Sequence, residues 1–191
     1  MNFALPLPSP QEVDAACAEF DLSDAADPAL FELIRWAPKN TDGRHVLLKV
    51  VALNRLYSTQ ILAVYEMARH IHGMGEAVDR ALEIGDPAIV DTISRLQVGA
   101  DGKIRNCFSF ASKYCSFHRL DAYPIYDSRV YRYLRYIEKQ DDFQTCVKRS
   151  TWTYAEFKAD IERLRLRYGL GGYTFKELDK FFWVHGDDSQ N

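Results

Sequence analysis

The amino-acid sequence predicts an all-α protein of about 8–10 helices. Apolar side chains recur three and four residues apart along most of the chain, which is the spacing of an amphipathic helix. No segment alternates between apolar and polar residues with the period of two that marks a strand. Helix-capping residues precede several apolar segments, and glycine or proline follows them. The 191 residues suffice for one domain or for two small lobes that share a core.

Six helices are predicted in the first half of the chain. The first begins at Ser9-Pro10, because serine caps a helix N-terminus and proline is favoured in the first turn. The third is apolar almost all round, which predicts burial on several sides. The fourth begins after Ser58 or Thr59 as its cap, and Gly85 ends the fifth. The predicted ranges are 9–20, 29–36, 45–56, 60–72, 76–84 and 86–96, with a turn over 40–43.

Four more helices are predicted in the second half, after a glycine-containing loop over 98–102. Pro124 cannot continue a helix, so the chain is expected to run extended before a new helix begins at Asp127. Two later helices begin with a threonine followed three residues on by a glutamate, which is the capping-box spacing. The predicted ranges are 108–118, 127–139, 153–168 and 174–184, and residues 186–191 are expected to form a frayed tail.

The composition is that of a globular protein, with 47% hydrophobic and 27% charged residues. No stretch approaches the about 20 apolar residues of a membrane span, and the N-terminus lacks the basic start of a signal peptide. The four cysteines form no CxxC pair, and neither they nor the five histidines show a metal-binding spacing. We therefore expect a cytoplasmic protein with free thiols, no metal, no cofactor and no membrane partner. The sequence predicts no particular oligomeric state.

The net charge of −3 gives no global attraction to nucleic acid, but the charge is unevenly distributed. Residues 1–100 carry 8 Lys+Arg and 14 Asp+Glu, whereas residues 101–150 carry 10 and 6. The basic segment is either a local anion-binding face or a solvated helix surface. Arginines and tyrosines interleave over 129–136, which suits contacts to nucleic acid. Equally, these tyrosines could pack into the core while the arginines face water.

Lys113 and Asp127 suggest chemistry most directly. Lys113 lies among aromatic residues on a predicted helix, and burial of that kind disfavours the charged form of an amine and makes it nucleophilic. The eight residues 119–126 can span about 26 Å, so the chain is long enough to bring Asp127 back beside Lys113. Such a pair could form and process a Schiff base. The alternative is structural: Asp127 is only a helix cap, and Lys113 extends along a buried helix to solvent.

Two phrases resemble the helix-hairpin-helix DNA glycosylase superfamily. Pro124-Ile-Tyr-Asp127-Ser-Arg-Val130 is similar to the phrase that bears the catalytic aspartate of that superfamily. Phe110-Ala-Ser-Lys113 is similar to the Phe-Ala-x-Lys of archaeal 8-oxoguanine DNA glycosylase/AP lyases, whose lysine is the Schiff-base nucleophile. The order of elements fits over residues 44–140. We expect a single all-α domain over 1–191, either one bundle or two small lobes that flank a cleft. The resemblance implies a glycosylase-like core at 44–140.

The resemblance also implies an activity, the excision of an oxidised purine from double-stranded DNA. Lys113 would attack C1′ of the deoxyribose and Asp127 would stabilise the sugar cation, after which β-elimination cuts the strand. The resemblance places the substrate contacts on Asn54, Ser58, Gln60, Phe110, Tyr114 and Tyr126. For the DNA backbone we expect contacts from Lys103 and Arg105 of the basic segment and from Arg129 of the segment in which arginines and tyrosines interleave. Each of the polar substrate-binding residues has an alternative interpretation as a cap or turn stabiliser.

The chain departs from the superfamily in the hairpin that grips a DNA phosphate. The usual Leu-Pro-Gly-Val-Gly is replaced by Leu96-Gln-Val-Gly-Ala-Asp-Gly102, and the chain is acidic overall. Phosphate neutralisation supplies much of the affinity for DNA, so this departure bears on binding. Two alternatives therefore stand beside the glycosylase. One is a non-catalytic nucleic-acid-binding or interaction protein on the same scaffold, and the other is a stress or phage-defence component acting on modified nucleotides.

Overall fold

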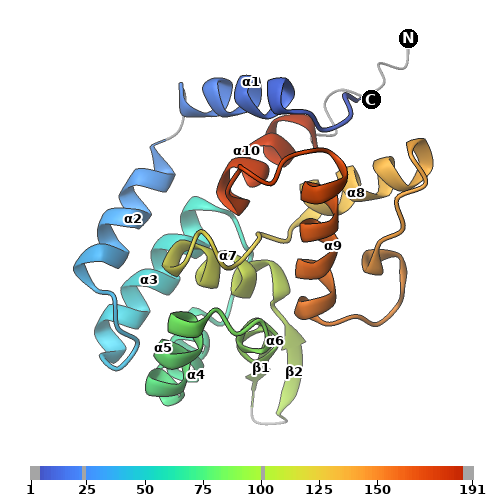
Figure 1. Ribbon diagram of the computed structural model, residues 1–191. Coiled ribbons are helices and arrows are strands. Elements are labelled where there is room, and N and C mark those ends of the chain that lie inside the picture. Colours follow the sequence, from blue (N-terminus) through green and yellow to red (C-terminus); the bar gives the residue numbers. More distant parts are fainter. Residues whose placement is uncertain (1–4, 23–24, 100–101, 187–191) are drawn as a thin grey trace. The chain divides into compact units, whose positions relative to one another are not determined.

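The computed structural model describes residues 5–22, 25–99 and 102–186. Within these ranges the chain is mostly helical, with ten α-helices, a short 3₁₀ helix and one two-stranded sheet (Figure 1). The all-α prediction is therefore confirmed in this coarse form. The chain forms two compact units, unit 1 from residues 1–24 and 124–191, and unit 2 from residues 25–123.

Unit 2 contains six helices and the sheet. Its elements, in order, are α2 (Ala26–Trp36), α3 (Gly43–Leu56), α4 (Val64–Gly73), α5 (Gly75–Ile84), α6 (Ala88–Ser94), β1 (Arg95–Val98), β2 (Lys103–Asn106) and α7 (Phe108–His118). Helix α7 packs against α2, α3 and α6, and α3 packs against α2 and α4. The helix predicted over 108–118 is found with the same bounds, and Gly85 ends α5 in the left-handed conformation with φ 73°.

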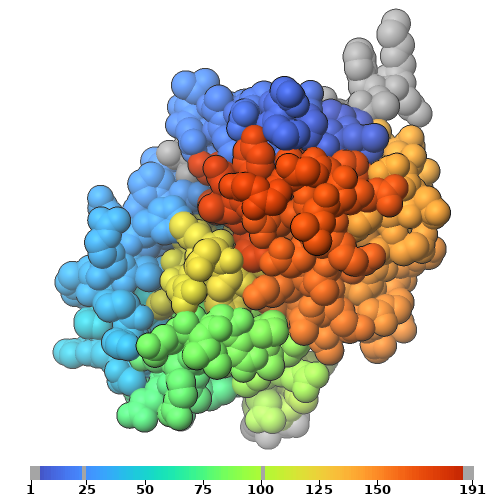
Figure 2. Space-filling model, in the orientation of Figure 1, coloured from blue at the N-terminus to red at the C-terminus, as the bar shows by residue number. Residues whose placement is uncertain are grey.

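The sequence did not predict the sheet. Strands β1 and β2 pair antiparallel, with Arg95 opposite Asn106 and Val98 opposite Lys103, so the helix predicted over 86–96 ends at Ser94. Residues 100–101 of the intervening loop lie outside the described residues. The side chains of β2 are exposed along its whole length, and Figure 2 shows this strand at the surface of unit 2. Strands as short and exposed as these show no clear alternation of apolar and polar residues from which a strand could be predicted.

Two further expectations for unit 2 were wrong in part. Helix α4 begins at Val64 rather than at residue 60, because the chain first makes an irregular turn over 57–63. Helix α3 is not buried all round, since Leu48 and Val51 are 49% and 46% exposed. The apolar pattern over 45–56 therefore overstated how many sides of this helix are covered.

A buried polar network joins the α2–α3 connection to three helices of unit 2. Asn40 is fully buried, and its Oδ1 accepts hydrogen bonds from Lys49 Nζ (2.7 Å) and Tyr114 Oη (2.6 Å). Its Nδ2 donates to Asp79 Oδ1 at 2.8 Å, and Lys49 Nζ lies 3.3 Å from His118 Nε2. We call these five residues the Asn40 network. A side chain at Gly75 would place its Cβ 2.6 Å from the Asn40 carbonyl oxygen, so glycine there permits this close approach.

Unit 1 is built from both ends of the chain. It contains α1 (Pro10–Asp21), α8 (Ser128–Gln140), the 3₁₀ helix η1 (Cys146–Lys148), α9 (Tyr154–Arg167) and α10 (Phe175–His185). Helix α10 packs against α1 and α8. The predicted caps are confirmed, because Ser9 accepts a hydrogen bond from the backbone of Glu12 and both α9 and α10 begin with a capping box.

Two of the three tyrosines of α8 pack into unit 1, whereas Tyr131 is exposed. Tyr133 is fully buried and donates to the Pro6 carbonyl at 2.6 Å, and Tyr136 donates to the Leu5 carbonyl at 2.7 Å. Of the two interpretations of the interleaved segment over 129–136, packing into the core therefore holds for these two residues. Their hydroxyls attach the first described residues to α8.

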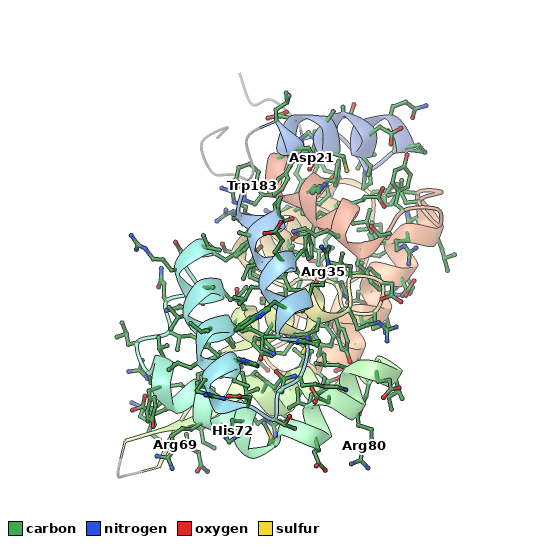
Figure 3. All side chains as sticks on the ribbon, turned by 90° about the vertical axis from the view of Figure 1, so that its left-hand side faces the viewer. Asp21, Arg35, Arg69, His72, Arg80 and Trp183 are labelled. Atoms are coloured by element: carbon green, nitrogen blue, oxygen red, sulfur yellow. The ribbon has the colours of Figure 1, made fainter. Side chains whose placement is uncertain are left out.

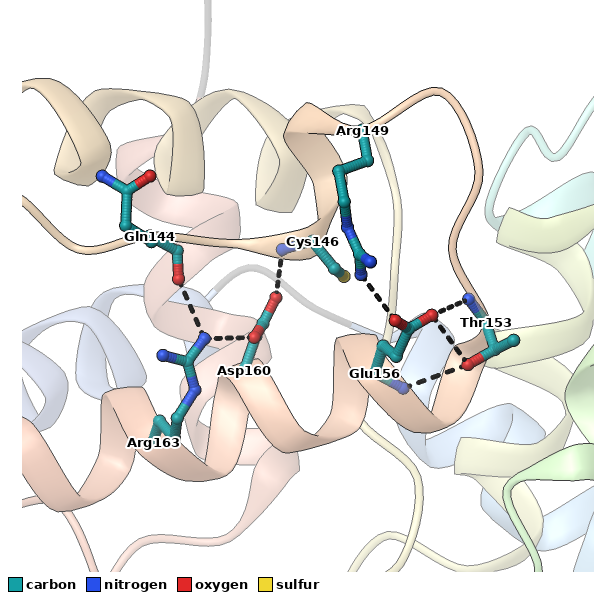
Figure 4. Close-up of polar contacts among 7 residues, drawn as sticks. All are labelled: Gln144, Cys146, Arg149, Thr153, Glu156, Asp160 and Arg163. Carbon is teal, nitrogen blue, oxygen red and sulfur yellow. Dashed lines mark hydrogen bonds and ion pairs between the residues drawn. The ribbon is translucent and has the colours of Figure 1, made fainter.

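A polar cluster fastens the irregular segment before α9 to that helix (Figure 4). The Asp160 carboxylate accepts from the Cys146 backbone and from Arg163, whose guanidinium also donates to the Gln144 carbonyl at 2.8 Å. Glu156 completes the capping box and binds Arg149 at 2.6 Å. The cluster satisfies backbone groups that a long irregular segment would otherwise leave unpaired.

No helix among the described residues is long and apolar enough to cross a membrane. The tail expected to fray lies, apart from Gly186, outside the described residues.

Candidate functional site

A cavity of about 190 Å³ in unit 2 brings several of the predicted residues together. It is lined by the segment 59–63, which includes Gln60, and by residues from Arg105 through Phe110 at the start of α7. Leu96 of β1 also lines it. The cavity therefore lies where the α3–α4 turn, the sheet and α7 meet.

Lys113 lies directly behind this wall. Its residue is only 5% exposed, and its Nζ donates to Ser109 Oγ at 3.2 Å. Ser109 lines the cavity and is one helical turn before Lys113, so the two side chains share a face of α7. The amine is thus connected to the cavity through a hydroxyl group.

The turn over 57–63 is held in an uncommon conformation. Ser58 and Gln60 both have positive φ angles, 48° and 58°, which non-glycine residues adopt at a cost of about 1–3 kcal/mol. The Asn54 side chain fixes the turn, because its Oδ1 accepts from Thr59 Oγ1 (2.8 Å) and Ile61 N (2.9 Å) and its Nδ2 donates to the Ile61 carbonyl (2.9 Å). Asn54 therefore stabilises the cavity wall, as its alternative interpretation held, while Ser58 and Gln60 are exposed.

Positive charge lies beside the cavity on β2. Arg105 lines the cavity, and Lys103 is exposed two residues before it on the same face of the strand. Cys107 also lines the cavity, but burial raises the pKa of its thiol, so the thiolate is disfavoured there. The cavity thus has a cationic edge and an apolar wall that includes Phe110.

Three predicted contact residues lie elsewhere. Tyr114 does not line the cavity; its ring is buried against Phe110, and burial raises the pKa of its hydroxyl, which donates to Asn40. Tyr126 packs in unit 1 against Trp152, with ring centroids 4.9 Å apart. Arg129, also in unit 1, lies over the Trp183 ring, 4.2 Å from its centroid.

Asp127 caps helix α8 in unit 1. Its Oδ1 accepts from the backbone N–H groups of Arg129 (3.0 Å) and Val130 (3.1 Å). The predicted role as a helix cap is therefore confirmed. Lys113 belongs to unit 2, so the two residues of the predicted pair are described in separate units.

Two other hollows of unit 2, of about 440 and 430 Å³, share the exposed His72. Arg69 lines the first and Arg80 the second, and Figure 3 shows these three side chains at the surface of the unit. None of the ionisable residues that line either hollow is buried, in contrast to the Lys113 site. The described residues contain no group of three or more His, Cys, Asp and Glu side chains that could hold a metal ion.

Sequence reasoning missed two buried ionisable groups of unit 2, Asp27 and Lys49. Asp27 is 5% exposed and accepts a hydrogen bond from the Tyr57 hydroxyl. Lys49 is 1% exposed, and burial lowers its pKa to about 8. Tyr57 lies 30 residues from Asp27, and Asn40 and His118 lie 9 and 69 residues from Lys49, so no local spacing predicts these contacts.

The chain belongs to the family HI_0787_N, whose model is described as an N-terminal domain and matches residues 12–122. The matched range includes the whole cavity, Lys113 and Asp27, and it ends before Asp127. An uncharacterized protein of Haemophilus influenzae is 36% identical over 138 residues, which are 71% of this chain and 63% of that protein. The chain thus spans less than two thirds of that relative's length. No solved structure is significantly similar to the chain.

Proposed function

We propose that the protein is a DNA glycosylase and AP lyase that excises an oxidised purine through a Schiff base on Lys113. The observation that carries the proposal is the buried amine of Lys113, joined through Ser109 to a cavity with an apolar wall and a cationic edge. The resemblance of two phrases to the helix-hairpin-helix glycosylases supports the same reaction. The matched family model assigns no activity.

The chemistry begins with a neutral Lys113 amine. Its nitrogen forms a bond to C1′ of the deoxyribose as the bond from C1′ to the base breaks, and the base leaves with the electron pair and takes up a proton. Opening of the sugar then gives an imine between Lys113 and C1′. Loss of a proton from C2′ with cleavage of the C3′–O bond cuts the strand. The base must first leave the duplex stack, at a cost of a few kcal/mol.

The neighbouring residues have separate roles in this proposal. Lys103 and Arg105 neutralise phosphates beside the cavity. Gln60 and Phe110 line the cavity and would contact the base by hydrogen bonding and by stacking. Asp127 would stabilise the positive charge that develops on the sugar.

The test is covalent trapping on DNA. A duplex with one abasic site is incubated with the protein and borohydride, and the wild-type protein is expected to form an adduct that Lys113→Gln does not form. Lys39→Gln, which removes an exposed amine of the same unit, should form the adduct at the wild-type rate. An adduct with Lys113→Gln would refute the nucleophile. No adduct with the wild-type protein would refute the lyase.

Duplex binding without catalysis is the second candidate. It is favoured by the exposed cations of β2, which do not depend on the chemistry of Lys113. Salt-sensitive binding of undamaged duplex, with no adduct and no base release, would support this candidate and exclude the first.

A further inference from the structure

One face of α7 carries Ser109, Lys113 and Phe117, spaced one helical turn apart. Ser109 lines the same cavity as residues 59–63, and the Phe117 ring lies 5.2 Å from the Tyr57 ring, measured between centroids. Lys113 lies between Ser109 and Phe117 on this face of α7.

Tyr57 contacts this face through its ring and binds a buried carboxylate through its hydroxyl. Its hydroxyl donates to Asp27, a residue of α2 that is only 5% exposed. Helix α2 is held against the same part of α7 by Phe31, whose ring lies 5.1 Å from that of Phe117. Burying a carboxylate costs several kcal/mol of folding free energy that an apolar residue would not cost. A role beyond packing would explain a carboxylate at this position.

We propose that Asp27, acting through Tyr57, accepts the proton that Lys113 must lose before it can attack a sugar. The inference rests on the function proposed above, because an ordinary lysine is protonated at neutral pH and cannot attack. An N–H bond of the Lys113 ammonium breaks and its proton goes to Tyr57 Oη. The hydroxyl proton of Tyr57 passes at the same time to Asp27. The products are a neutral amine, an intact phenol and a carboxylic acid.

Most other ionisable groups on α2, α3 and α7 belong to the Asn40 network or to the surface. The exception is the buried thiol of Cys115, whose pKa burial raises far above its usual range, so it stays neutral throughout the assay. Lys49 of α3 and Tyr114 of α7 bond to Asn40, which binds Asp79 of α5. Burial and the charge of Lys49 lower the pKa of His118 to about 3, and Lys49 itself has a pKa of about 8. His118 therefore stays neutral from about pH 6 to about pH 9, whereas Lys49 titrates near the alkaline end in the wild type and the variants alike, so its effect cancels when their rates are compared. The remaining charged side chains of α2, α3 and α7 are exposed or only partly buried: Glu32, Arg35, Arg44, His45 and Arg55.

The test measures how fast the borohydride adduct forms on abasic DNA from about pH 6 to about pH 9. Asp27→Asn keeps a hydrogen-bond acceptor for Tyr57, and Tyr57→Phe keeps the ring contact with Phe117. Near pH 6.5 each variant should form the adduct at least tenfold more slowly than wild type, which is within the range of general-base effects. The deficit should shrink towards pH 9, where hydroxide can take the proton. The double variant should be no slower than the slower single variant.

Asp121→Asn is the matched control, since it removes a carboxylate of unit 2 whose side chain is 68% exposed. It should retain the wild-type pH profile. Adduct formation by both test variants at the wild-type rate would overturn the inference, and so would an equal slowing at every pH, which is the mark of a structural defect. If Asp27→Asn does not fold, the profile of Tyr57→Phe decides. Absence of an adduct with wild type would instead overturn the proposed function, and this inference with it.

Discussion

Replacing Lys49 by methionine should remove a pH-dependent part of the folding free energy. Burial lowers the pKa of this ammonium group from 10.5 to about 8, so the unfolded chain binds the proton more tightly than the folded protein does. Burying the charged ammonium group lowers the free energy of unfolding, and this cost is fully present below about pH 8. The cost fades as the pH rises towards 10.5, so the wild-type protein gains stability over that interval.

The magnitude follows from the pKa difference. A shift of about 2.5 pKa units corresponds to about 3 kcal/mol in total at 1.36 kcal/mol per unit. Between about pH 7 and about pH 9.5 the linkage relation gives a gain of about 2 kcal/mol for the wild type. Methionine has a similar length and no charge, so the variant should lack this gain.

The assay is urea unfolding of both proteins at intervals from about pH 7 to about pH 9.5, followed by circular dichroism. The quantity of interest is the difference between the two free energies of unfolding, because tyrosine ionisation is common to both proteins and cancels. That difference should change by about 2 kcal/mol in favour of the wild type as the pH rises. Two parallel curves would show that Lys49 keeps its ordinary pKa, and the account of the Asn40 network would fail.

Three further predictions concern the candidate site. Asp127→Asn should melt at nearly the wild-type temperature, since asparagine caps a helix about as well as aspartate does. Its rate of base release should fall by about 10²-fold or more, and cleavage at the wild-type rate would remove Asp127 from the mechanism. Lys103→Ala and Arg105→Ala should each weaken binding to all duplex sequences alike, because phosphate contacts carry no sequence information. Each should also reduce the slope of log affinity against log salt by about 1, and an unchanged slope would count against phosphate contacts. Asn54→Ala should cost about 1–3 kcal/mol in thermal unfolding, because the backbone groups of Ile61 lose their partner; unchanged stability would mean that the turn holds without it.

The sequence predicted best those elements whose signals are local. Ser9 with Pro10, the two capping boxes and the glycine after α5 each lie within one turn of the helix end that they define, and those ends were found within about two residues. The start of α4 was misplaced because the carboxamide of Asn54 holds the preceding turn open, and that interaction cannot be read from the residues at 58–60 alone.

The candidate site could be predicted only in part for the same reason. Gln60 and Phe110 were expected to bind the damaged base and Arg105 to contact the DNA backbone, and all three line one cavity. Tyr114 was expected there as well, but it follows Lys113 directly in the helix and therefore lies on another face. On that face its hydroxyl donates a hydrogen bond to Asn40. The bond between Tyr57 and Asp27 joins residues 30 apart, and such pairings depend on how helices pack.

The assembly of unit 1 from the two ends of the chain has a consequence for protein synthesis. Residues 25–123 leave the ribosome as one continuous stretch, so unit 2 can fold while the rest is still being translated. Helix α1 is made before unit 2, whereas α10, against which it packs, is made after unit 2. At about 5–20 residues per second, the apolar side chains of α1 wait roughly 10–30 s for their partner. During this interval the apolar side chains of α1, among them Val13 and Phe20, lack their packing partner, so α1 is a natural target for chaperones.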